Sequence, residues 1–330
     1  MTGALVVGVV TYDSAGVLPG LIESLPAALS GVDSWRLVVA DNASSDDTAD
    51  TVRRLAPDAE LVAMGGNRGY AAGVNACTAA DPAADVLVLN PDIRLRPGSA
   101  ARLRAATAAD PAVGIAVPRL LGADGRLAPS LRRSPTAVRA LGEALLGGTL
   151  TRRVPALGEV VGDPAAYRRP TTAEWASGAA MLLTRACLDA VGRWDESFFL
   201  YSEETDFALR ARDAGYLLRL VPDAEAVHVG GEAHVAPPLW SLLVANKVRL
   251  HARRHGRAGA AAFWSAVAAG EAVRAAAGRG PAGRAPHRAA VAALLRERAA
   301  LLRGEPPASV LGWLRAYRPG GIQPEGVVPP

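Results

Sequence analysis

Short apolar runs alternate with amphipathic segments over the first 120 residues. Residues 4–10 (ALVVGVV) are continuously apolar, which is typical of a parallel strand covered on both faces. Residues 17–29 instead space their apolar side chains as a helix does, and Pro19 suits a first helical turn. The alternation continues with strands expected at 36–40, 60–63 and 85–89 and helices expected from about 46 and over 69–79. This order predicts a doubly wound α/β sheet, which binds ligands at the carboxyl ends of its strands.

The rest of the chain is less regular. Residues 120–172 are rich in Arg, Gly and Pro and only weakly periodic, so we expect a long, partly mobile excursion lying over the site. Regular structure returns in strands expected at 178–183 and 216–221 and helices expected at 185–191 and 203–214. Residues 238–303 follow a helical pattern with an interruption near 278–286, and residues 319–330 are expected to form a flexible end. We therefore predict a catalytic domain over residues 1–235 and an α-helical extension over residues 236–330.

Charge separates these two parts. From Ala236 onward the chain has 14 Lys/Arg against 4 Asp/Glu, which leaves 22 against 28 for the preceding residues. An acidic body with a basic helical tail suits an enzyme that works beside an anionic membrane. We expect the tail to dock on anionic lipid or on a second copy of the chain, which would make a homodimer.

Compartment signals are few. Cys77 and Cys187 stand singly in apolar surroundings, and we interpret them as buried thiols of a reducing compartment. No secretory signal precedes the first strand, and no uncharged apolar run reaches the roughly 18 residues of a membrane-spanning helix. The sequence thus predicts a cytoplasmic protein with peripheral contact at the inner face of the cell membrane.

Polar loops follow each of the first four predicted strands, at residues 11–13, 41–42, 67–75 and 90–92. A nucleotide base needs a flat stacking surface and a polar partner at its edge, which Tyr12 and Asp41 would supply. Gly69 allows close approach of the backbone, and Arg68 brings positive charge toward a phosphate. The alternatives are that Asp41 forms a turn or helix cap and that Arg68 is solvated.

Seven sequence strings carry a family resemblance: VTYDS, VADNASSDDT, GGNRGYAAGVN, LVLNPDIRL, WASGAAMLLTR, GRWDESFFLYSEETDFALRAR and AVHVGG. In this order, over about residues 4–255, they resemble the inverting family-2 glycosyltransferases, and most of all the bacterial rhamnosyltransferase-like members. The resemblance implies a Rossmann-like nucleotide-diphospho-sugar transferase fold of GT-A type, with a mostly parallel sheet and flanking helices. It also implies transfer of a sugar, with inversion, from a nucleotide diphosphate to a hydroxyl group in cell-surface glycan assembly.

The resemblance assigns the donor contacts. It places the base and ribose against Thr11, Tyr12, Asp13 and Asp41. Further donor contacts are expected from Asn67, Arg68, Gly69, Asn75 and Asn90. A dTDP-linked deoxysugar such as rhamnose is favoured by resemblance, a UDP-sugar stays open, and a polyprenyl-linked glycan is the expected acceptor.

A metal site is expected where Asn90-Pro91-Asp92 occupies the position of the family's DxD motif. A divalent cation would neutralise the charge of the leaving diphosphate, and Mg²⁺ or Mn²⁺ prefers hard oxygen ligands. Asp92 is the candidate carboxylate. Because Asn90 replaces the first acid of the motif, His228 or water would complete the metal shell. A plain turn at 90–92 and a structural His228 are the alternatives.

The acidic segment 202–206 is expected to hold the catalytic base. Inversion requires a base on the acceptor side, and the resemblance points to Glu204, with Glu203 and Asp206 as alternates. Acids in a first helical turn also suit the helix dipole, and Asp206 with Arg210 makes an ordinary i,i+4 pair.

The acceptor wall is expected to include Trp175, Ser177, Gly178 and Trp194. For Trp194, packing and acceptor contact are equally expected. Asn246, Lys247 and Arg249 lie on the first helix of the tail, where they either reach phosphates or form a solvated helix face.

Three other function classes fit parts of the pattern. A nicotinamide dehydrogenase would carry GxGxxG directly after the first strand, where this chain has VVTYDSAG. A non-catalytic nucleotide-sugar or lipid-carrier binding protein stays open because the DxD is imperfect, although Asp92, Glu204 and His228 argue against it. The basic tail lacks regularly spaced aromatic residues and a nucleic-acid-binding motif, so no nucleic-acid partner is expected.

Overall fold

The chain forms two compact units in the computed structural model, which describes residues 4–151, 154–229, 236–278 and 283–316. The sheet unit comprises Met1–Arg132, Asp163–Glu196 and Glu203–Gly230. The helical unit comprises Arg133–Gly162, Ser197–Ser202 and Gly231–Pro330. The contacts therefore do not follow the expected linear division at residue 236, because residues 133–162 and 197–202 group with the C-terminal helices.

The sheet unit is built on a nine-stranded mixed sheet with the order β3-β2-β1-β4-β10-β6-β11-β5, and β8 also pairs with β11. Its first four strands are parallel: β1 (Leu5–Thr11), β2 (Trp35–Asp41), β3 (Glu60–Ala63) and β4 (Asp85–Leu89). The remaining strands are β5 (Ile93–Leu95), β6 (Val113–Gly122), β8 (Thr171–Ala173), β10 (Ala180–Leu183) and β11 (Leu217–His228). A separate ribbon pairs β7 (Leu131–Arg132) with β9 (Trp175–Ala176). The mostly parallel pairing near the N-terminus agrees with the continuous apolar runs.

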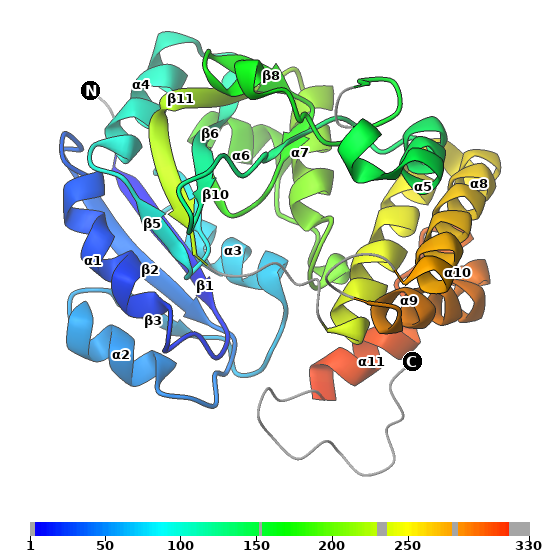
Figure 1. The fold of residues 1–330 in the computed structure, drawn as a ribbon. Helices are drawn as coiled ribbons and strands as arrows, with labels where there is room; N and C mark the ends of the chain where they lie inside the picture. Colours follow the sequence, from blue (N-terminus) through cyan, green and yellow to red (C-terminus); the bar gives the residue numbers. More distant parts are fainter. Residues whose placement is uncertain (1–3, 152–153, 230–235, 279–282, 317–330) are drawn as a thin grey trace. The chain divides into compact units, whose positions relative to one another are not determined.

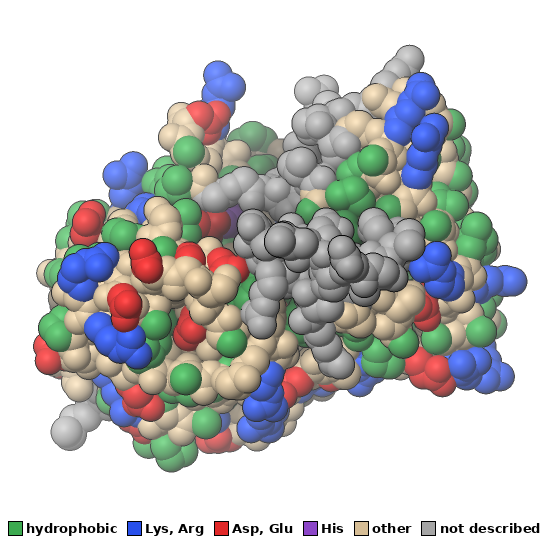
Figure 2. Space-filling view, turned by 90° about the horizontal axis from the view of Figure 1, so that it is seen from below, with side chains coloured by type: hydrophobic (Ala, Val, Ile, Leu, Met, Phe, Trp, Pro, Cys, Tyr) green, Lys and Arg blue, Asp and Glu red, His purple; other side chains and the backbone are tan. Residues whose placement is uncertain are grey.

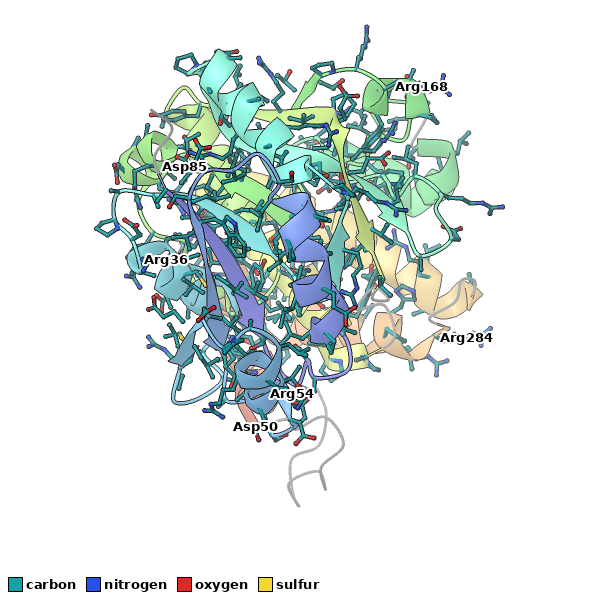
Figure 3. The ribbon with its side chains drawn as sticks, turned by 90° about the vertical axis from the view of Figure 1, so that its left-hand side faces the viewer. Arg36, Asp50, Arg54, Asp85, Arg168 and Arg284 are labelled. Carbon is teal, nitrogen blue, oxygen red and sulfur yellow. The ribbon has the colours of Figure 1, made fainter. Side chains whose placement is uncertain are left out.

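Helices cover both faces of this sheet (Figure 1). They are α1 (Leu18–Ala28), α2 (Thr48–Leu55), α3 (Tyr70–Ala79), α4 (Ser99–Ala109), α6 (Arg185–Val191) and α7 (Glu203–Asp213), with short 3-10 turns at Pro164–Tyr167 and Glu196–Phe198. Figure 3 shows α1 lying across one face, with Asp50 and Arg54 projecting outward from α2.

Alternate side chains of β1 pack on the two faces of the sheet. Leu5, Val7 and Val9 of β1 are buried in one cluster with apolar residues of α1 and α4. The opposite face packs against α3, where a Cβ added to Gly73 would lie 2.5 Å from Cγ1 of Val10. A fully buried Val or Leu stabilises the fold by about 1.5–3 kcal/mol, so this strand is anchored on both sides.

Two expectations about the chain after residue 120 need correction. The excursion at 120–172 contains regular structure: the end of β6, β7, the helix α5 (Ala137–Thr151), a 3-10 turn and the start of β8. The strand expected at 216–221 continues to His228 as β11. Its pairing with β6 shifts register between Val221 and Glu225, and this irregularity accommodates Pro222, which otherwise signals the end of a strand.

The helical unit packs α5 and α9 (Ala285–Arg296) against α8 (Pro237–Ala277), with α10 (Arg298–Leu302) and α11 (Ala308–Ala316) alongside (Figure 1). Gly256 adopts φ 67° and breaks α8 into two arms, which lets Phe263 and Val248 share one buried cluster. The interruption expected near 278–286 is confirmed by the end of α8 and the start of α9. The end expected at 319–330 lies outside the described residues.

Within the described part of the chain, no helix is long and apolar enough to cross a membrane. Both cysteines are buried and neither forms a disulfide, as the interpretation of buried thiols requires. Burial raises the pKa of Cys77 to about 12 and that of Cys187 likewise to about 12.

The close packing of α3 on β1 can be tested with Gly73→Ala. Alanine favours a helix over glycine by about 1 kcal/mol. Here the added Cβ would collide with the buried Val10, however, and overpacking costs about 1–3 kcal/mol. We expect urea denaturation to report a lower free energy of unfolding. Gly66→Ala is the control, because nothing lies within 4 Å of its added Cβ. Equal stability of the two variants would contradict this packing.

Candidate functional site

The carboxyl ends of β1 and β2 are joined through a carboxylate. Thr11 and Asp41 are register partners, and the Thr11 hydroxyl donates to Oδ1 of Asp41 over 2.8 Å. The backbone N–H and hydroxyl of Ser44 also donate to Asp41, over 3.1 and 2.5 Å. Asp41 therefore shapes its own turn, as the turn interpretation requires, and stands buried at the strand end where a donor base was expected.

Asp13 ties the first loop to the second. Its backbone adopts φ 47°, which is uncommon for a residue other than glycine and costs of order 1–3 kcal/mol. Oδ1 of Asp13 accepts from the backbone N–H of Ser45 over 2.6 Å and from its hydroxyl over 3.1 Å. Oδ2 is buried and has no hydrogen-bond partner among the described residues. This strained carboxylate thus offers a spare acceptor at the strand ends. Tyr12, beside it, is half-buried.

The third loop is held by Asn42, which was not among the expected site residues. Its amide accepts from the backbone N–H of Arg68 over 3.2 Å and donates to the carbonyl of Gly69 over 3.3 Å. Asn67 accepts from the N–H of Gly69 over 3.1 Å, and Gly69 itself has φ 88°. Asn42 is 3% exposed. A polar residue directly after Asp41 at a strand end was the available signal.

Asn75 and Arg68 both contact Glu196. The Asn75 amide nitrogen donates to the carbonyl of Trp194 over 2.9 Å and to Oε1 of Glu196 over 3.0 Å, and its oxygen accepts from the N–H of Trp194. The Asn75 side chain therefore holds residues 194–196 in place through these hydrogen bonds. Arg68 pairs with Glu196 at 3.3 Å, but its side chain is 58% exposed. An exposed pair of this kind contributes about 0–1 kcal/mol, so the guanidinium exchanges partners at little cost.

Glu196 stays ionised. Burial acts to raise its pKa, yet hydrogen bonds from Arg193 and Asn75 hold the pKa of Glu196 below its ordinary value.

Asp92 and His228 are brought together by β5 and β11. His228 pairs in register with Ile93, and Nε2 of His228 lies 3.1 Å from Oδ2 of Asp92. Oδ1 of Asp92 is buried and lacks a hydrogen-bond partner within the described residues. Asn90 lies two residues before Asp92, with its backbone N–H donating to the carbonyl of Ala179. No group of three or more His, Cys, Asp or Glu in the described ranges is arranged to hold a metal. The two glycines that end the AVHVGG string lie outside those ranges.

Tyr70, at the start of α3, is influenced by the negative charges of three carboxylates. Burial raises the pKa of Tyr70 well above its ordinary value, and the negative charges of Glu203, Glu204 and Asp92 act in the same direction. The neutral hydroxyl donates to the carbonyl of Gly178 over 3.2 Å. A Cβ added to Gly178 would lie 3.3 Å from Cβ of Glu204. The expected metal carboxylate and the expected base thus border one neighbourhood within the sheet unit.

The three acids in the first turn of α7 have different surroundings. Oδ2 of Asp206 accepts from Nε of Arg210 over 2.7 Å, and Arg210 also donates to the carbonyls of Val191 and Arg193. Asp206 therefore forms the i,i+4 pair with Arg210 that the sequence indicated. Glu203 is buried, whereas Glu204 is half-buried beside Gly178.

The aromatic residues of the expected acceptor wall also differ. Trp194 is 2% exposed, stacked on Phe207 at 5.1 Å between ring centroids and edge-on to Tyr70 at 6.3 Å. Its burial favours packing over acceptor contact. Trp175 is half-buried in β9, with the Arg132 guanidinium 5.9 Å from its ring centre. Ser177 follows, and its N–H donates to the carbonyl of Ser130 over 3.0 Å.

Asn246, Lys247 and Arg249 do not form a solvated helix face. Asn246 and Arg249 are buried and bonded within the helical unit, and Lys247 pairs with Glu159. Burial acts to lower the pKa of Lys247, but the carboxylates of Glu159 and Glu143 raise it above its ordinary value. A cavity of about 270 Å³ between α5 and α8 is lined partly by Glu143 and Lys247.

Known sequences identify the family of this chain. The family described as Glycosyl transferase family 2 matches residues 6–157. N-acetylglucosaminyl-diphospho-decaprenol L-rhamnosyltransferase of Mycobacterium tuberculosis is 33% identical over 241 residues, which cover 69% of this chain and 76% of that protein. Low-salt glycan biosynthesis hexosyltransferase Agl10 of Haloferax volcanii is 28% identical over 211 residues, or 63% of this chain and 62% of that protein.

Solved structures with a similar fold are GT-A glycosyltransferases. Mannosyltransferase PcManGT from Pyrobaculum calidifontis, solved with GDP-Man and Mn²⁺, has a TM-score of 0.52 at 22% identity, covering 90% of this chain and 79% of that one. GalNAc-T7, solved with UDP, GalNAc and Mn²⁺, has a TM-score of 0.51 at 12% identity; the match covers 78% of this chain and about half, 51%, of that one. The expected GT-A fold is confirmed, and by sequence the chain belongs to glycosyltransferase family 2.

Proposed function

We propose that this chain transfers a deoxysugar, with inversion, from a nucleotide diphosphate to a hydroxyl group of a polyprenyl-linked glycan. The observation that carries the proposal is that Glu204 lies beside Gly178, the hydrogen-bond acceptor of Tyr70, whose pKa the charges of Asp92, Glu203 and Glu204 all raise. Separate carboxylates are needed on the leaving-group side and on the acceptor side of an inverting displacement. A site with carboxylates on both sides favours inverting sugar transfer over the binding of a nucleotide sugar without transfer.

The donor nucleotide is proposed to bind at the ends of β1 and β2. The buried Oδ2 of Asp13 is an acceptor that a ribose hydroxyl would satisfy, and leaving such an atom without a partner costs about 1–3 kcal/mol. Thr11, Tyr12 and Asp41 border the same loops. Arg68, with its exposed and exchangeable ion pair, is proposed to turn from Glu196 toward the donor phosphates.

Asp92 and His228 are proposed to hold a divalent cation, Mg²⁺ or Mn²⁺. The donor set fits such an ion, because the orphaned Oδ1 of Asp92 and the nearby imidazole are a carboxylate and a nitrogen ligand. Two protein ligands suffice when phosphate oxygens and water supply the rest. A bound cation would neutralise charge on the leaving diphosphate. The relatives solved with Mn²⁺ are in keeping with this proposal.

Glu204 is proposed to be the base. The acceptor hydroxyl gives its proton to a carboxylate oxygen of Glu204 as the acceptor oxygen bonds to the anomeric carbon. The bond from that carbon to the diphosphate oxygen breaks, and its electron pair leaves with the diphosphate, so one displacement inverts the carbon. Asp206 is held by Arg210 and Glu203 is buried, whereas Glu204 is half-buried, which supports Glu204 as the base.

The sugar and the acceptor are proposed from the relatives. The protein of Mycobacterium tuberculosis is named for L-rhamnose and a decaprenol-linked acceptor, which supports a dTDP-linked deoxysugar here, with UDP-sugars as the alternative.

Membrane contact is proposed to run through α5 of the helical unit rather than through the tail alone. This unit carries 18 Lys/Arg against 7 Asp/Glu, and basic side chains predominate on its face in Figure 2. Five apolar residues of α5 are 45–71% exposed: Val138, Leu141, Leu145, Leu146 and Leu150. An exposed apolar helix face on a basic unit suits an anionic lipid surface, where a polyprenyl acceptor resides.

Donor and metal binding can be tested by thermal shift. We expect a dTDP-sugar with Mn²⁺ or Mg²⁺ to raise the melting temperature of the wild type, since binding to the folded state stabilises it by mass action. Asp92→Asn should lose the metal-dependent part of the shift. Asp206→Asn is the control for removing an acid outside the metal site. Equal shifts with and without metal would contradict the metal proposal.

Glu204→Gln tests the base. The variant should bind donor within about twofold of the wild type and lose transfer by a factor of about 10²–10⁴, the range for a general base. Donor binding is measured by calorimetry and transfer by release of the nucleoside diphosphate. Normal turnover in Glu204→Gln would refute its role, and donor binding by a wild type that never transfers would favour the non-catalytic alternative.

Sedimentation with phosphatidylglycerol vesicles tests the contact through α5. The double variant Leu141→Ser/Leu145→Ser should bind about tenfold or more weakly, since burying each Leu side chain contributes about 1.5–3 kcal/mol. Leu295→Ser, which changes a leucine that is 60% exposed on α9, is the matched control. If both variants bound vesicles like the wild type, α5 would not be the contact.

A further inference from the structure

The six residues before α7 follow a strained path. Phe199, Tyr201 and Ser202 have φ values of 66°, 66° and 72°, all in the left-handed region. Residues with a Cβ pay roughly 1–2 kcal/mol each for this conformation. Such a path persists only where surrounding groups hold it. The next residue along the chain is Glu203, followed by Glu204.

Asn246 of α8 holds the backbone of this segment. Its side chain is fully buried, and its amide nitrogen donates to the carbonyls of Phe198, Leu200 and Tyr201 over 2.8, 2.9 and 3.2 Å. One side chain thus binds three carbonyls within four residues. Arg249, one turn later, donates to the carbonyl of Ser197 over 3.0 Å.

The side chains of the segment are held as well. Phe199 is buried in one cluster with Leu242 of α8 and Leu311 of α11, and Leu200 and Tyr201 pack against it. The Arg249 guanidinium lies 4.3 Å from the ring centre of Phe198. The helices α8 and α11 therefore hold residues 197–202 through their backbone carbonyls and through their apolar side chains.

We infer that Asn246 is a positioning residue for the acidic start of α7. It acts through the peptide bond between Ser202 and Glu203: the left-handed path that Asn246 stabilises fixes where α7 begins and how Glu204 is presented. This inference rests on the proposed role of Glu204 as base. The Asn246 nitrogen has only two hydrogens for its three carbonyl acceptors, so none remains for a phosphate.

The first test measures hydrogen exchange of the amides at residues 197–206 by mass spectrometry. Asn246→Asp replaces the donor with an oxygen that repels the three carbonyls, and Asn246→Ala removes it without adding charge. Both should exchange at least tenfold faster at 197–206. Val248→Ala, a buried change on the same helix away from these carbonyls, controls for general loss of stability. Unchanged exchange in both Asn246 variants, or the same acceleration in Val248→Ala, would overturn the inference.

The second test separates positioning from binding. In Asn246→Ala, kcat should fall about 10–100-fold, because misplacement by about 1 Å costs about 10²-fold, while donor affinity stays within about twofold. Val248→Ala should keep kcat. Loosened residues 197–206 with an unchanged kcat would overturn the inference. A wild type that transfers no sugar would instead refute the proposed function, and exchange at 203–206 would still decide whether Asn246 holds the start of α7.

Discussion

The register of β1 with its neighbours is the constraint on which the candidate site depends. Thr11 pairs with Asp41 and Val9 with Leu89, so three parallel strands end at one edge of the sheet. Because both faces of these strands are buried, polar groups gather in the loops at that edge, where each needs a partner. Asp41 and Asn42 meet this need with hydrogen bonds that connect the neighbouring loops along this edge.

At this edge, a few hydrogen-bond acceptors of the described residues have no donor. Asp13 and Asp92 each keep a buried oxygen without a hydrogen-bond partner among the described residues. Tyr70 stays neutral beside carboxylates, so it donates a hydrogen bond without adding negative charge. A site with surplus acceptors favours ligands that bring donors or positive charge, such as sugar hydroxyls and a divalent cation.

The hydrophobic pattern of the sequence predicted those strands and helices that depend on residues close together in the chain. The apolar runs at 60–63 and 85–89 became β3 and β4 with the expected bounds, and Asp92 met His228. The sequence could not reveal that Asn75 binds Trp194, since that contact joins residues 119 positions apart. For the same reason, the burial of Asn246 depended on helices far along the chain. The helix at residues 137–151 was not predicted, because some of its apolar side chains pack against a partner helix while others are exposed.

The interleaving of the two units bears on how the protein is made. The chain passes between the units after residues 132, 162, 196, 202 and 230. During synthesis, residues 133–162 and 197–202 leave the ribosome well before α8, the helix that binds them. The sheet can therefore pair its strands early, while the left-handed segment before α7 has to wait for Asn246. We therefore expect the acidic start of α7 to reach its final position late in folding, after α8 has been made.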